Sequence, residues 1–311
     1  MTALYLGVDG GGSKTEFVCI DADRQVRARA VTGTTYHLQI GVEGALARLR
    51  DGLDAVCSQA GITPGDLRHC FFGLPAFGED ATVDPILEKG CGQLLGHDRY
   101  ACGNDMICGW AGSLAGEDGI NIVSGTGSIG YGERSGRAAR AGGWGEIVSD
   151  EGSGYWIALR GLNAFTRMSD GRLPKGPLHA MLAEALSLRE DLDLCARIMG
   201  EGALGRNEVA ALSTVVARAA DANDVVASAI LHDAADELFR IANALRTQLG
   251  YEDEERTLLS WSGGILANGG AVPSRLTALV ERDGRFDLVM PRLSPGVGAA
   301  LYAMKKAAPT V

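Results

Sequence analysis

The stretch Gly7-Val8-Asp9-Gly10-Gly11-Gly12-Ser13-Lys14-Thr15 decides the fold. Asp9 ends a short apolar run that predicts a strand, Leu4–Asp9, and the glycines after it let the main chain turn and take positive φ angles. A second extended run, Thr15–Asp21, follows the turn. Because consecutive N–H groups in such a turn can point at one anion, the stretch predicts a hairpin that holds a phosphate.

A second glycine-rich turn has the same surroundings. The run Gly119–Ser124 predicts a strand, the turn is Ser124-Gly125-Thr126-Gly127-Ser128-Ile129-Gly130, and Ser128–Glu133 returns as the partner strand. Two such hairpins in one chain predict that the phosphates of a nucleotide are held between two related halves.

The order of the elements around the two turns is also doubled. Each half begins with three strands and continues with alternating helices and strands, which predicts two stacked α/β domains that meet near residues 113–118. The remaining strands of the prediction are Gln25–Val31, 70–75, Arg99–Gly103, Arg137–Ala141, Arg256–Trp261 and Asp287–Met290. The predicted helices are Val42–Gln59, Val83–Leu95, Asp105–Leu114, Glu151–Arg167, four within residues 177–250, one around Val272–Glu281, and Ala299–Lys306.

Other phosphate sites explain the turns less well. The second turn matches the dinucleotide pattern G-x-G-x-x-G, but Tyr131–Gly136 lacks the helical periodicity that this site needs at its last glycine. The first turn departs from the P-loop at Val8 and Ser13, and a strand follows it instead of a helix. Plain hairpin turns remain an alternative, because Gly and Ser are common in them.

Composition limits the function classes. The chain has 311 residues and a formal net charge of −10, which disfavours nucleic acid or an anionic membrane surface as the main partner. The N-terminal residues do not resemble a signal peptide, and no apolar run is long enough to span a membrane. The seven cysteines include no Cys-x-x-Cys pair, so we expect reduced thiols and a cytoplasmic protein.

Four segments together resemble the sugar-kinase, heat-shock and actin superfamily, and within it the N-acetylglucosamine kinases of the BadF/BadG/BcrA/BcrD ATPase family. They are Gly7–Thr15, Gly103-Asn104-Asp105, Ser124–Ser128, and Gly142-Gly143-Trp144-Gly145 continuing to 149–156. The segments 261–265 and 295–300 resemble the adenosine loop and the closing helix of that family.

The resemblance implies a fold and a domain division. It implies two ribonuclease-H-like (actin-like ATPase) domains of the α/β class, each a five-stranded mixed sheet flanked by helices, with a cleft between them. The N-terminal domain would span residues 1–114 and be completed by a C-terminal helix, 296–311. The C-terminal domain would span 115–295 and carry a helical insertion at about 177–250.

The resemblance also implies ATP-dependent phosphorylation of the 6-hydroxyl of an amino sugar, with N-acetyl-D-glucosamine as the first substrate, Mg²⁺ as the cofactor and a homodimer as the assembly. Asp105 ends a predicted strand and opens a helix, so we expect it to be the catalytic base, although an Asp there can also cap the helix. Asp9 would bind Mg²⁺ through water, although it could instead form a hydrogen bond within its own turn, and Lys14 could equally be a solvated surface lysine. The nucleotide-binding residues would be Gly10, Gly11, Gly12, Ser13, Lys14, Thr15, Gly125, Thr126, Gly127, Gly263 and Gly264.

The sugar site would combine both halves. By resemblance, the sugar-binding residues would be Tyr36, Asp105, Ser128, Ile129, Gly143, Trp144, Gly145 and Asp150. Trp144 could instead be a core residue, and Glu151 is expected to start the following helix. Tyr36 stands where family members tend to carry Asn, and a phenol cannot reproduce the paired donor and acceptor of an amide.

Three functions therefore remain after the sequence analysis. The first is the amino-sugar kinase, with glucosamine as the alternative substrate. The second is a BadF-type activator ATPase, whose iron–sulfur cluster would need cysteines such as Cys102 and Cys108 presented together. The third is a sugar sensor without catalysis, although no basic helix-turn-helix segment precedes Leu4.

Overall fold

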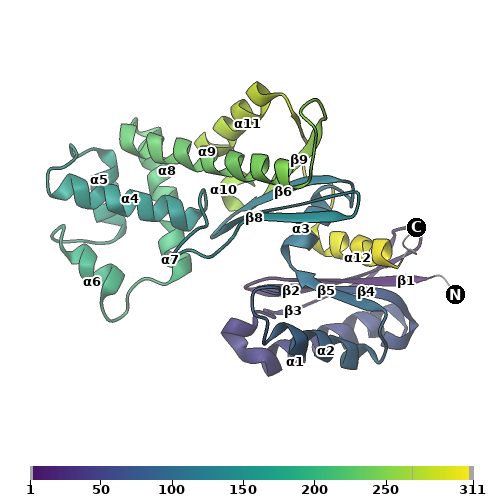
Figure 1. Cartoon of the computed structure of the whole chain (residues 1–311). Helices are drawn as coiled ribbons and strands as arrows, with labels where there is room; N and C mark the ends of the chain where they lie inside the picture. Colours follow the sequence, from purple (N-terminus) through teal and green to yellow (C-terminus); the bar gives the residue numbers. More distant parts are fainter. Residues whose placement is uncertain (1–2, 268, 308–311) are drawn as a thin grey trace. The chain divides into compact units, whose positions relative to one another are not determined.

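The computed structural model describes residues 3–267 and 269–307. The chain divides into two compact units: unit 1 contains the residues up to Asp118 and those from Val289 onward, and unit 2 contains Gly119–Leu288. The chain therefore leaves unit 1, builds the whole of unit 2, and returns to unit 1 for its last helix (Figure 1).

Unit 1 is built on a five-stranded mixed sheet with the order β3-β2-β1-β4-β5. β1 pairs antiparallel with β2 and parallel with β4, and β4 pairs parallel with β5. The strands are β1 (Leu4–Gly10), β2 (Lys14–Asp21), β3 (Val26–Gly33), β4 (Leu67–Leu74) and β5 (Tyr100–Asn104). The three N-terminal strands predicted from the sequence are confirmed.

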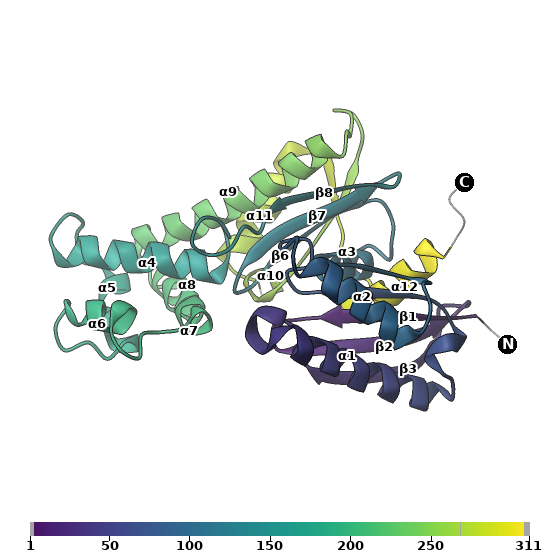
Figure 2. The same cartoon turned by 60° about the horizontal axis from the view of Figure 1, so that its bottom comes forward.

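Helices cover both faces of this sheet. The helical elements of unit 1 are α1 (His37–Ala60), η1 (Pro64–Asp66), α2 (Asp84–Leu95), α3 (Met106–Ser113) and α12 (Pro295–Lys306). Side chains of β2 alternate between the faces: Phe17 packs in the core beneath α1 and α2, whereas Val18 packs against α12. Figure 2 shows α1 and α2 on the same side of the sheet.

Glycines allow α12 to approach the sheet and α3 at backbone distance. A Cβ atom added to Gly7 would lie 2.0 Å from the backbone nitrogen of Ala300, and one added to Gly298 would lie 2.1 Å from the nitrogen of Gly112. No side chain fits at either position, so the C-terminal helix is part of the core of unit 1.

Unit 2 repeats the strand plan of unit 1. Its sheet has the order β10-β9-β6-β7-β8, with β6 antiparallel to β7 and parallel to β9. The strands are β6 (Gly119–Ser124), β7 (Ser128–Arg134), β8 (Arg137–Gly142), β9 (Thr257–Ser262) and β10 (Phe286–Leu288). In both units the first strand is central, the second and third lie to one side of it, and the later strands lie to the other, which confirms the predicted doubling.

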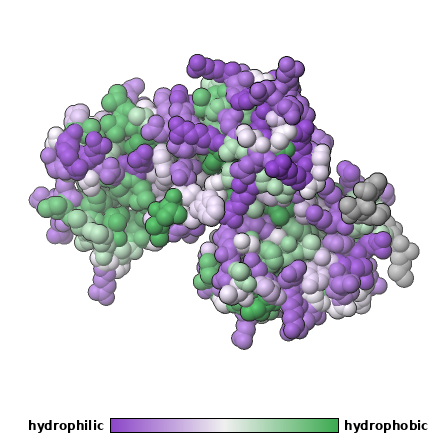
Figure 3. Space-filling view, in the orientation of Figure 1, coloured by the Kyte–Doolittle hydropathy of each residue, from purple (hydrophilic) through white to green (hydrophobic). Residues whose placement is uncertain are grey.

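The helices of unit 2 form two groups. One group covers the sheet, and the other, α4 to α8 within residues 154–221, is called the helical segment below. α9 (Val225–Gln248) packs on β6, β7 and β8, and α11 (Ala271–Asp283) packs on α9. The other helices are α4 (Gly154–Ser169), α5 (Pro177–Ala185), α6 (Asp193–Met199), α7 (Arg206–Ala211), α8 (Ser213–Asp221) and α10 (Gly264–Ala267). Hydrophobic residues gather on the visible face of the helical segment between α4 and α6 (Figure 3).

Several predicted helices differ from the structure, and the C-terminal helix begins at Pro295 rather than Ala299. Residues 177–250 contain five helices rather than four, because short turns split the Ala- and Leu-rich stretch. Helix α4 begins at Gly154, so the expectation that Glu151 starts it is wrong: Asp150 and Gly152 have φ angles of 58° and 82°, which a right-handed helix cannot contain. Helix α1 begins at His37 instead of Val42, ahead of a break at Gly41 (φ 73°).

No helix in the described part of the chain is long and apolar enough to cross a membrane.

Candidate active site

The first glycine loop is a tight turn between β1 and β2. The N–H of Gly11 donates to the carbonyl of Lys14 (2.9 Å), and Gly12, Ser13 and Lys14 are exposed. Gly10 must lack a side chain, because a Cβ atom there would lie 2.7 Å from Thr35 Oγ1. The turn therefore presents backbone and side-chain donors to solvent on a rigid base.

Residues 34–36 tie this loop to the start of α1. Thr34 Oγ1 donates to the carbonyl of Gly11 (2.8 Å) and accepts from the N–H of Tyr36 (3.0 Å). Thr15 is fully buried, and its hydroxyl bonds that of Thr35 (3.0 Å). The candidate phosphate loop and the candidate sugar residue Tyr36 are thus joined through one threonine.

The residue next to Tyr36 is an unusual histidine. His37 is buried, its ring lies edge-on to that of Tyr36 at 6.1 Å, and neither of its ring nitrogens has a hydrogen-bond partner among the described residues. Both residues stand at the first turn of α1, where Tyr36 makes no side-chain cap.

Acidic side chains gather at the end of β1. Asp9 is paired with Glu16 across the β1–β2 ladder, and Asp105 lies close enough to act on it electrostatically. Burial raises the pKa of Asp9 to about 7, and the charges of Asp105 and Glu16 add to this effect, whereas Cys108 and Lys14 oppose it. Lys14 and the Arg29 guanidinium, which bonds Glu16 (2.7 Å), offset part of this negative charge, but the pKa of Asp9 stays raised, so a cation beside Asp9 would be favoured.

Asp105 precedes α3 without capping it. Its side chain makes no cap hydrogen bond, and the carbonyl oxygen of the Asn104 side chain accepts from the N–H of Met106 instead (3.2 Å). Asp105 is thus the N-cap residue of α3 by position, but its carboxylate does not cap the helix. Gly73 allows this close packing, since a Cβ atom there would lie 2.2 Å from Cys108 Sγ and 3.4 Å from the Cα of Asp105.

The second glycine loop is bonded to the segment that leads into α4. The N–H of Gly125 donates to the carbonyl of Gly127 (2.9 Å), and the carbonyls of Gly125 and Thr126 accept from the N–H groups of Gly154 (2.8 Å) and Tyr155 (3.2 Å). Ser128 is buried, and its hydroxyl donates to the carbonyl of Glu151 (2.7 Å). The loop and the start of α4 form one rigid substructure.

The predicted sugar turn is strongly curved and open. Gly143 and Gly145 have φ angles of 69° and 94°, and a Cβ atom at Gly143 would lie 2.6 Å from the side chain of Ile129. Trp144 is 78% exposed, so the alternative that it is a core residue is wrong. An exposed indole between two glycines with positive φ angles is suited to stacking on a ligand.

Asp150 is buried and has a partner that sequence reasoning missed. Its Oδ2 accepts from Arg206 Nη2 (2.9 Å), and Arg206 Nε also lies 3.2 Å from Glu146 Oε2. Burial raises the pKa of Asp150, and Arg206 acts against this rise. No motif in the sequence marks Arg206, which lies 56 residues away on α7.

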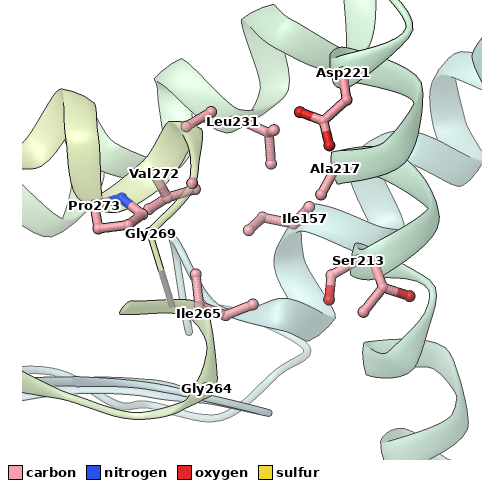
Figure 4. A pocket seen from close by; sticks show the side chains of 13 residues that line it. Ile157, Ser213, Ala217, Asp221, Leu231, Gly264, Ile265, Gly269, Val272 and Pro273 are labelled. Carbon is pink, nitrogen blue, oxygen red and sulfur yellow. The ribbon is translucent and has the colours of Figure 1, made fainter. Parts of the chain in front are cut away.

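The end of β9 closes the set of predicted nucleotide contacts. Gly263 has a φ of 98°, and a Cβ atom there would lie 2.2 Å from the carbonyl oxygen of Ser124, so only glycine lets β9 approach the second loop. Gly264 then lines a pocket with Ile157, Asp221, Leu231 and Val272 (Figure 4). The lining combines apolar side chains with the hydroxyls of Ser213 and Thr214 and the carboxylate of Asp221, which suits a flat heteroaromatic ring with an amino group.

The described residues fit some metal ions and not others. No group of three or more His, Cys, Asp or Glu side chains in the described residues could hold a metal ion. Mg²⁺ keeps several waters and takes only one or two protein carboxylates beside substrate phosphates, so Asp9 with its raised pKa fits such an ion. The thiol of Cys108 is buried against the carbonyl of Val8 (3.6 Å), whereas Cys102 neighbours Cys91.

Comparison with known proteins gives consistent matches. The N-acetyl-D-glucosamine kinase of Dictyostelium discoideum is 30% identical over 311 residues, which is 97% of this chain and 98% of the relative. The N-acetylmuramic acid/N-acetylglucosamine kinase of Clostridium acetobutylicum is 32% identical over 266 residues, 85% of each chain. The crystal structure of a Chromobacterium violaceum protein proposed to be an N-acetylglucosamine kinase superposes with a TM-score of 0.73 at 26% identity, covering 96% of this chain and 98% of that one.

The two units are thus α/β domains of the actin-like ATPase type, each with its five-stranded mixed sheet and flanking helices. The model of the BadF/BadG/BcrA/BcrD ATPase family matches residues 6–303. The doubled strand order, the two glycine loops and this match across nearly the whole sequence lead to one conclusion: the chain belongs to the BadF/BadG/BcrA/BcrD ATPase family.

Proposed function

We propose that the protein is an ATP-dependent hexosamine kinase that transfers the γ-phosphoryl group of ATP to the 6-hydroxyl of N-acetyl-D-glucosamine. The observation that carries the proposal is the carboxylate of Asp105, which does not cap α3 and lies near Asp9 at the phosphate loop. The similarity to an N-acetyl-D-glucosamine kinase (30% identity) and to an N-acetylmuramic acid/N-acetylglucosamine kinase (32% identity) supports it.

Phosphoryl transfer needs positioning, charge stabilisation and one proton acceptor. In the proposed reaction Asp105 accepts the proton of the 6-hydroxyl, the freed oxygen forms a bond to the γ-phosphorus, and the bond from that phosphorus to the leaving ADP oxygen breaks. The main-chain amides of Gly10–Gly12 and Gly125–Gly127, with Ser13, Lys14 and Thr15, are proposed to hold the phosphates.

Mg²⁺ is proposed as the cofactor. When bound, it supplies positive charge that neutralises the phosphate oxygens. Asp9 would hold it through water, and the unfavourable burial of that carboxylate supports the assignment.

The adenine ring is proposed to occupy the pocket beside Gly263 and Gly264. Ile157, Ile265 and Val272 would contact its faces, and Asp221 at the end of α8 would accept a hydrogen bond from the exocyclic amino group. The apolar character of the pocket supports a neutral ring there rather than a phosphate.

The sugar is proposed to bind Asp150, Trp144 and the backbone around Gly143, Gly145, Ser128 and Ile129, with Tyr36 from unit 1. Glucosamine is the second candidate, because Tyr36 replaces an amide in the family pattern and cannot form its paired hydrogen bonds. A panel of N-acetylglucosamine, glucosamine, N-acetylmuramic acid and glucose, scored by ADP release with and without Mg²⁺, separates these substrates.

Replacement of the base tests the reaction. Asp105→Asn should lower kcat by about 10²–10⁴-fold while the Kd of ATP changes little, because an amide cannot accept the proton. Asp98→Asn, at an exposed carboxylate, is the matched control and should keep wild-type kcat. If Asp105→Asn kept more than about a tenth of wild-type kcat, the general-base role would be excluded.

Assembly and location complete the proposal. We propose a homodimer, as the family resemblance implies, and light scattering at several protein concentrations measures it. We also propose a cytoplasmic location, which the seven free cysteines support, because reduced thiols persist in that compartment.

A further inference from the structure

Arg206 connects the helical segment of unit 2 with Asp150 of the proposed sugar site. It is the first residue of α7, whose start is fixed by a hydrogen bond from the N–H of Gly205 to Glu208 Oε2 (2.8 Å). α7 packs on α4, and a Cβ atom at Gly154 would lie 3.3 Å from the carbonyl of Ala210. The guanidinium is therefore held by a packed helix rather than by a mobile loop.

From this helix the guanidinium reaches two carboxylates of the sugar turn. Nη2 donates to Asp150 Oδ2 (2.9 Å), and Nε lies 3.2 Å from Glu146 Oε2. The arginine side chain is 41% exposed, whereas that of Asp150 is 4% exposed. Arg206 is therefore the member of the pair that is accessible to solvent.

The same guanidinium lies against the second glycine loop. A Cβ atom at Gly127 would lie 2.7 Å from Arg206 Nη2 and 2.6 Å from Asp150 Oδ2. Glycine at 127 thus leaves space for the Asp150–Arg206 pair. This pair joins the second glycine loop, the sugar turn and the helical segment.

We propose that Arg206 is a positioning residue for the sugar: it keeps Asp150 ionised and oriented so that this carboxylate can accept hydrogen bonds from sugar hydroxyls. The inference rests on the proposed function, in which Asp150 binds the sugar. Asp150 also has a left-handed backbone (φ 58°), which fixes where its side chain begins but not its charge.

The charge of Asp150 depends on its neighbours. Burial is the main influence that raises its pKa, with a further contribution from Glu146, whereas Arg206 and the N–H of Gly145 lower it. Without the guanidinium, a buried carboxylate would have to take up a proton at higher pH. A protonated Asp150 has lost one acceptor and would bind hydroxyl groups less well.

Arg206→Met tests this role, because methionine keeps much of the side-chain length and removes the charge. We expect the KM for the sugar to rise about tenfold or more, the KM for ATP to change less than about twofold, and the acid limb of kcat/KM for the sugar to move to higher pH. Arg206→Lys should recover part of the loss. Arg197→Met, at an exposed arginine on α6, is the matched control and should behave as wild type.

Two results would overturn the inference. The first is an unchanged KM for the sugar and an unchanged pH profile in a folded Arg206→Met variant. The second is a rise confined to the KM for ATP, which would mean that Arg206 acts on the nucleotide through the second glycine loop. A double-mutant cycle of Arg206→Met and Asp150→Asn, measured by urea unfolding without substrates, separates this from the proposed function. A coupling energy in a protein that phosphorylates no hexosamine would support the Arg206–Asp150 interaction and contradict the proposed kinase function. Hexosamine phosphorylation without a coupling energy would contradict the Arg206–Asp150 interaction.

Discussion

At the scale of single residues, the half-buried Asp9 and the buried Asp150 show how one side chain acquires different chemistry. Asp9 has acidic neighbours, and its pKa rises to about 7. Asp150 faces an arginine that works against the rise caused by burial. Burial penalises both charges, and the neighbouring groups decide which of the two carboxylates is left uncompensated in the unliganded protein.

The raised pKa of Asp9 predicts a pH-dependent stability. The folded-state pKa (about 7) exceeds the ordinary value (3.8), so the folded protein binds more protons than the unfolded chain between these values. The contribution of Asp9 to the free energy of unfolding is therefore fully present below about pH 4 and is lost as the pH rises from there through about 7. Asp9→Asn should remove that loss and raise the free energy of unfolding at pH 8 by up to about 4 kcal/mol relative to wild type.

Urea unfolding of both proteins at pH 5, 6, 7 and 8, without nucleotide, measures this effect. The difference in free energy between variant and wild type should increase with pH. A difference that stays constant across the range would mean that Asp9 is ionised at all these pH values.

At the scale of elements, the nucleotide pocket depends on helices distant in the sequence. α4, α8, α9, α10 and α11 contribute Ile157, Ala217, Leu231, Ile265 and Val272, and Figure 4 shows these side chains directed toward one space. Most of the lining residues come from five helices spread over residues 154–283, so no local motif describes the pocket. Of its lining residues, only Gly264 and Ile265 belong to a segment that the sequence analysis singled out.

Filling the pocket should affect the nucleotide selectively. In Ala217→Phe the ring would occupy space needed by adenine, so we expect the KM for ATP to rise about tenfold or more and the KM for the sugar to stay within about twofold. Steady-state kinetics with each substrate varied in turn measures both. Ala229→Phe, at an exposed position of α9, should leave both values unchanged. An equal rise in both KM values would indicate general damage rather than a blocked pocket.

At the scale of the whole molecule, the return of the chain to unit 1 is the decisive feature. α12 follows the whole of unit 2 in sequence, yet packs on β1 and α3. Val297, Ala300 and Leu301 of this helix bury Val18 and Ile20 of β2. The first 118 residues therefore leave one face of their sheet to be covered by the last elements of the chain.

Crowding at the crossing of α12 and α3 should lower stability. In Gly298→Ala the new methyl group would meet the nitrogen of Gly112 and the carbonyl of Cys108, and both are backbone atoms that cannot rotate away. We expect a loss of about 1–3 kcal/mol in the free energy of unfolding. Gly65→Ala is the control, because its Cβ atom would meet only Thr63 Oγ1 at 3.7 Å. Equal stability of the two variants in urea would show that the helices can separate without cost.

The sequence predicted the parts of the molecule that depend on local chemistry. The strands around Asp9 and Ser124 were predictable from apolar runs that end in glycine, and the doubled order of elements followed from them. The prediction was less accurate where backbone angles are set by distant packing: Gly152 allows contact with the carbonyl of Ala234 on α9, and this delays the start of α4 beyond Glu151. The site residues chosen from motifs remain proposals.

By itself, then, the sequence determined the strand plan, the two glycine loops and the identity of the carboxylates beside them, because glycine and aspartate act through their own backbone freedom and charge. Only the tertiary structure decided which charges meet. Arg206 reaches Asp150 across 56 residues, and Asp105 comes close to Asp9 because β1, β4 and β5 are neighbours in one sheet. Electrostatic interaction depends on distance in space and on burial, and neither is written in the order of the residues.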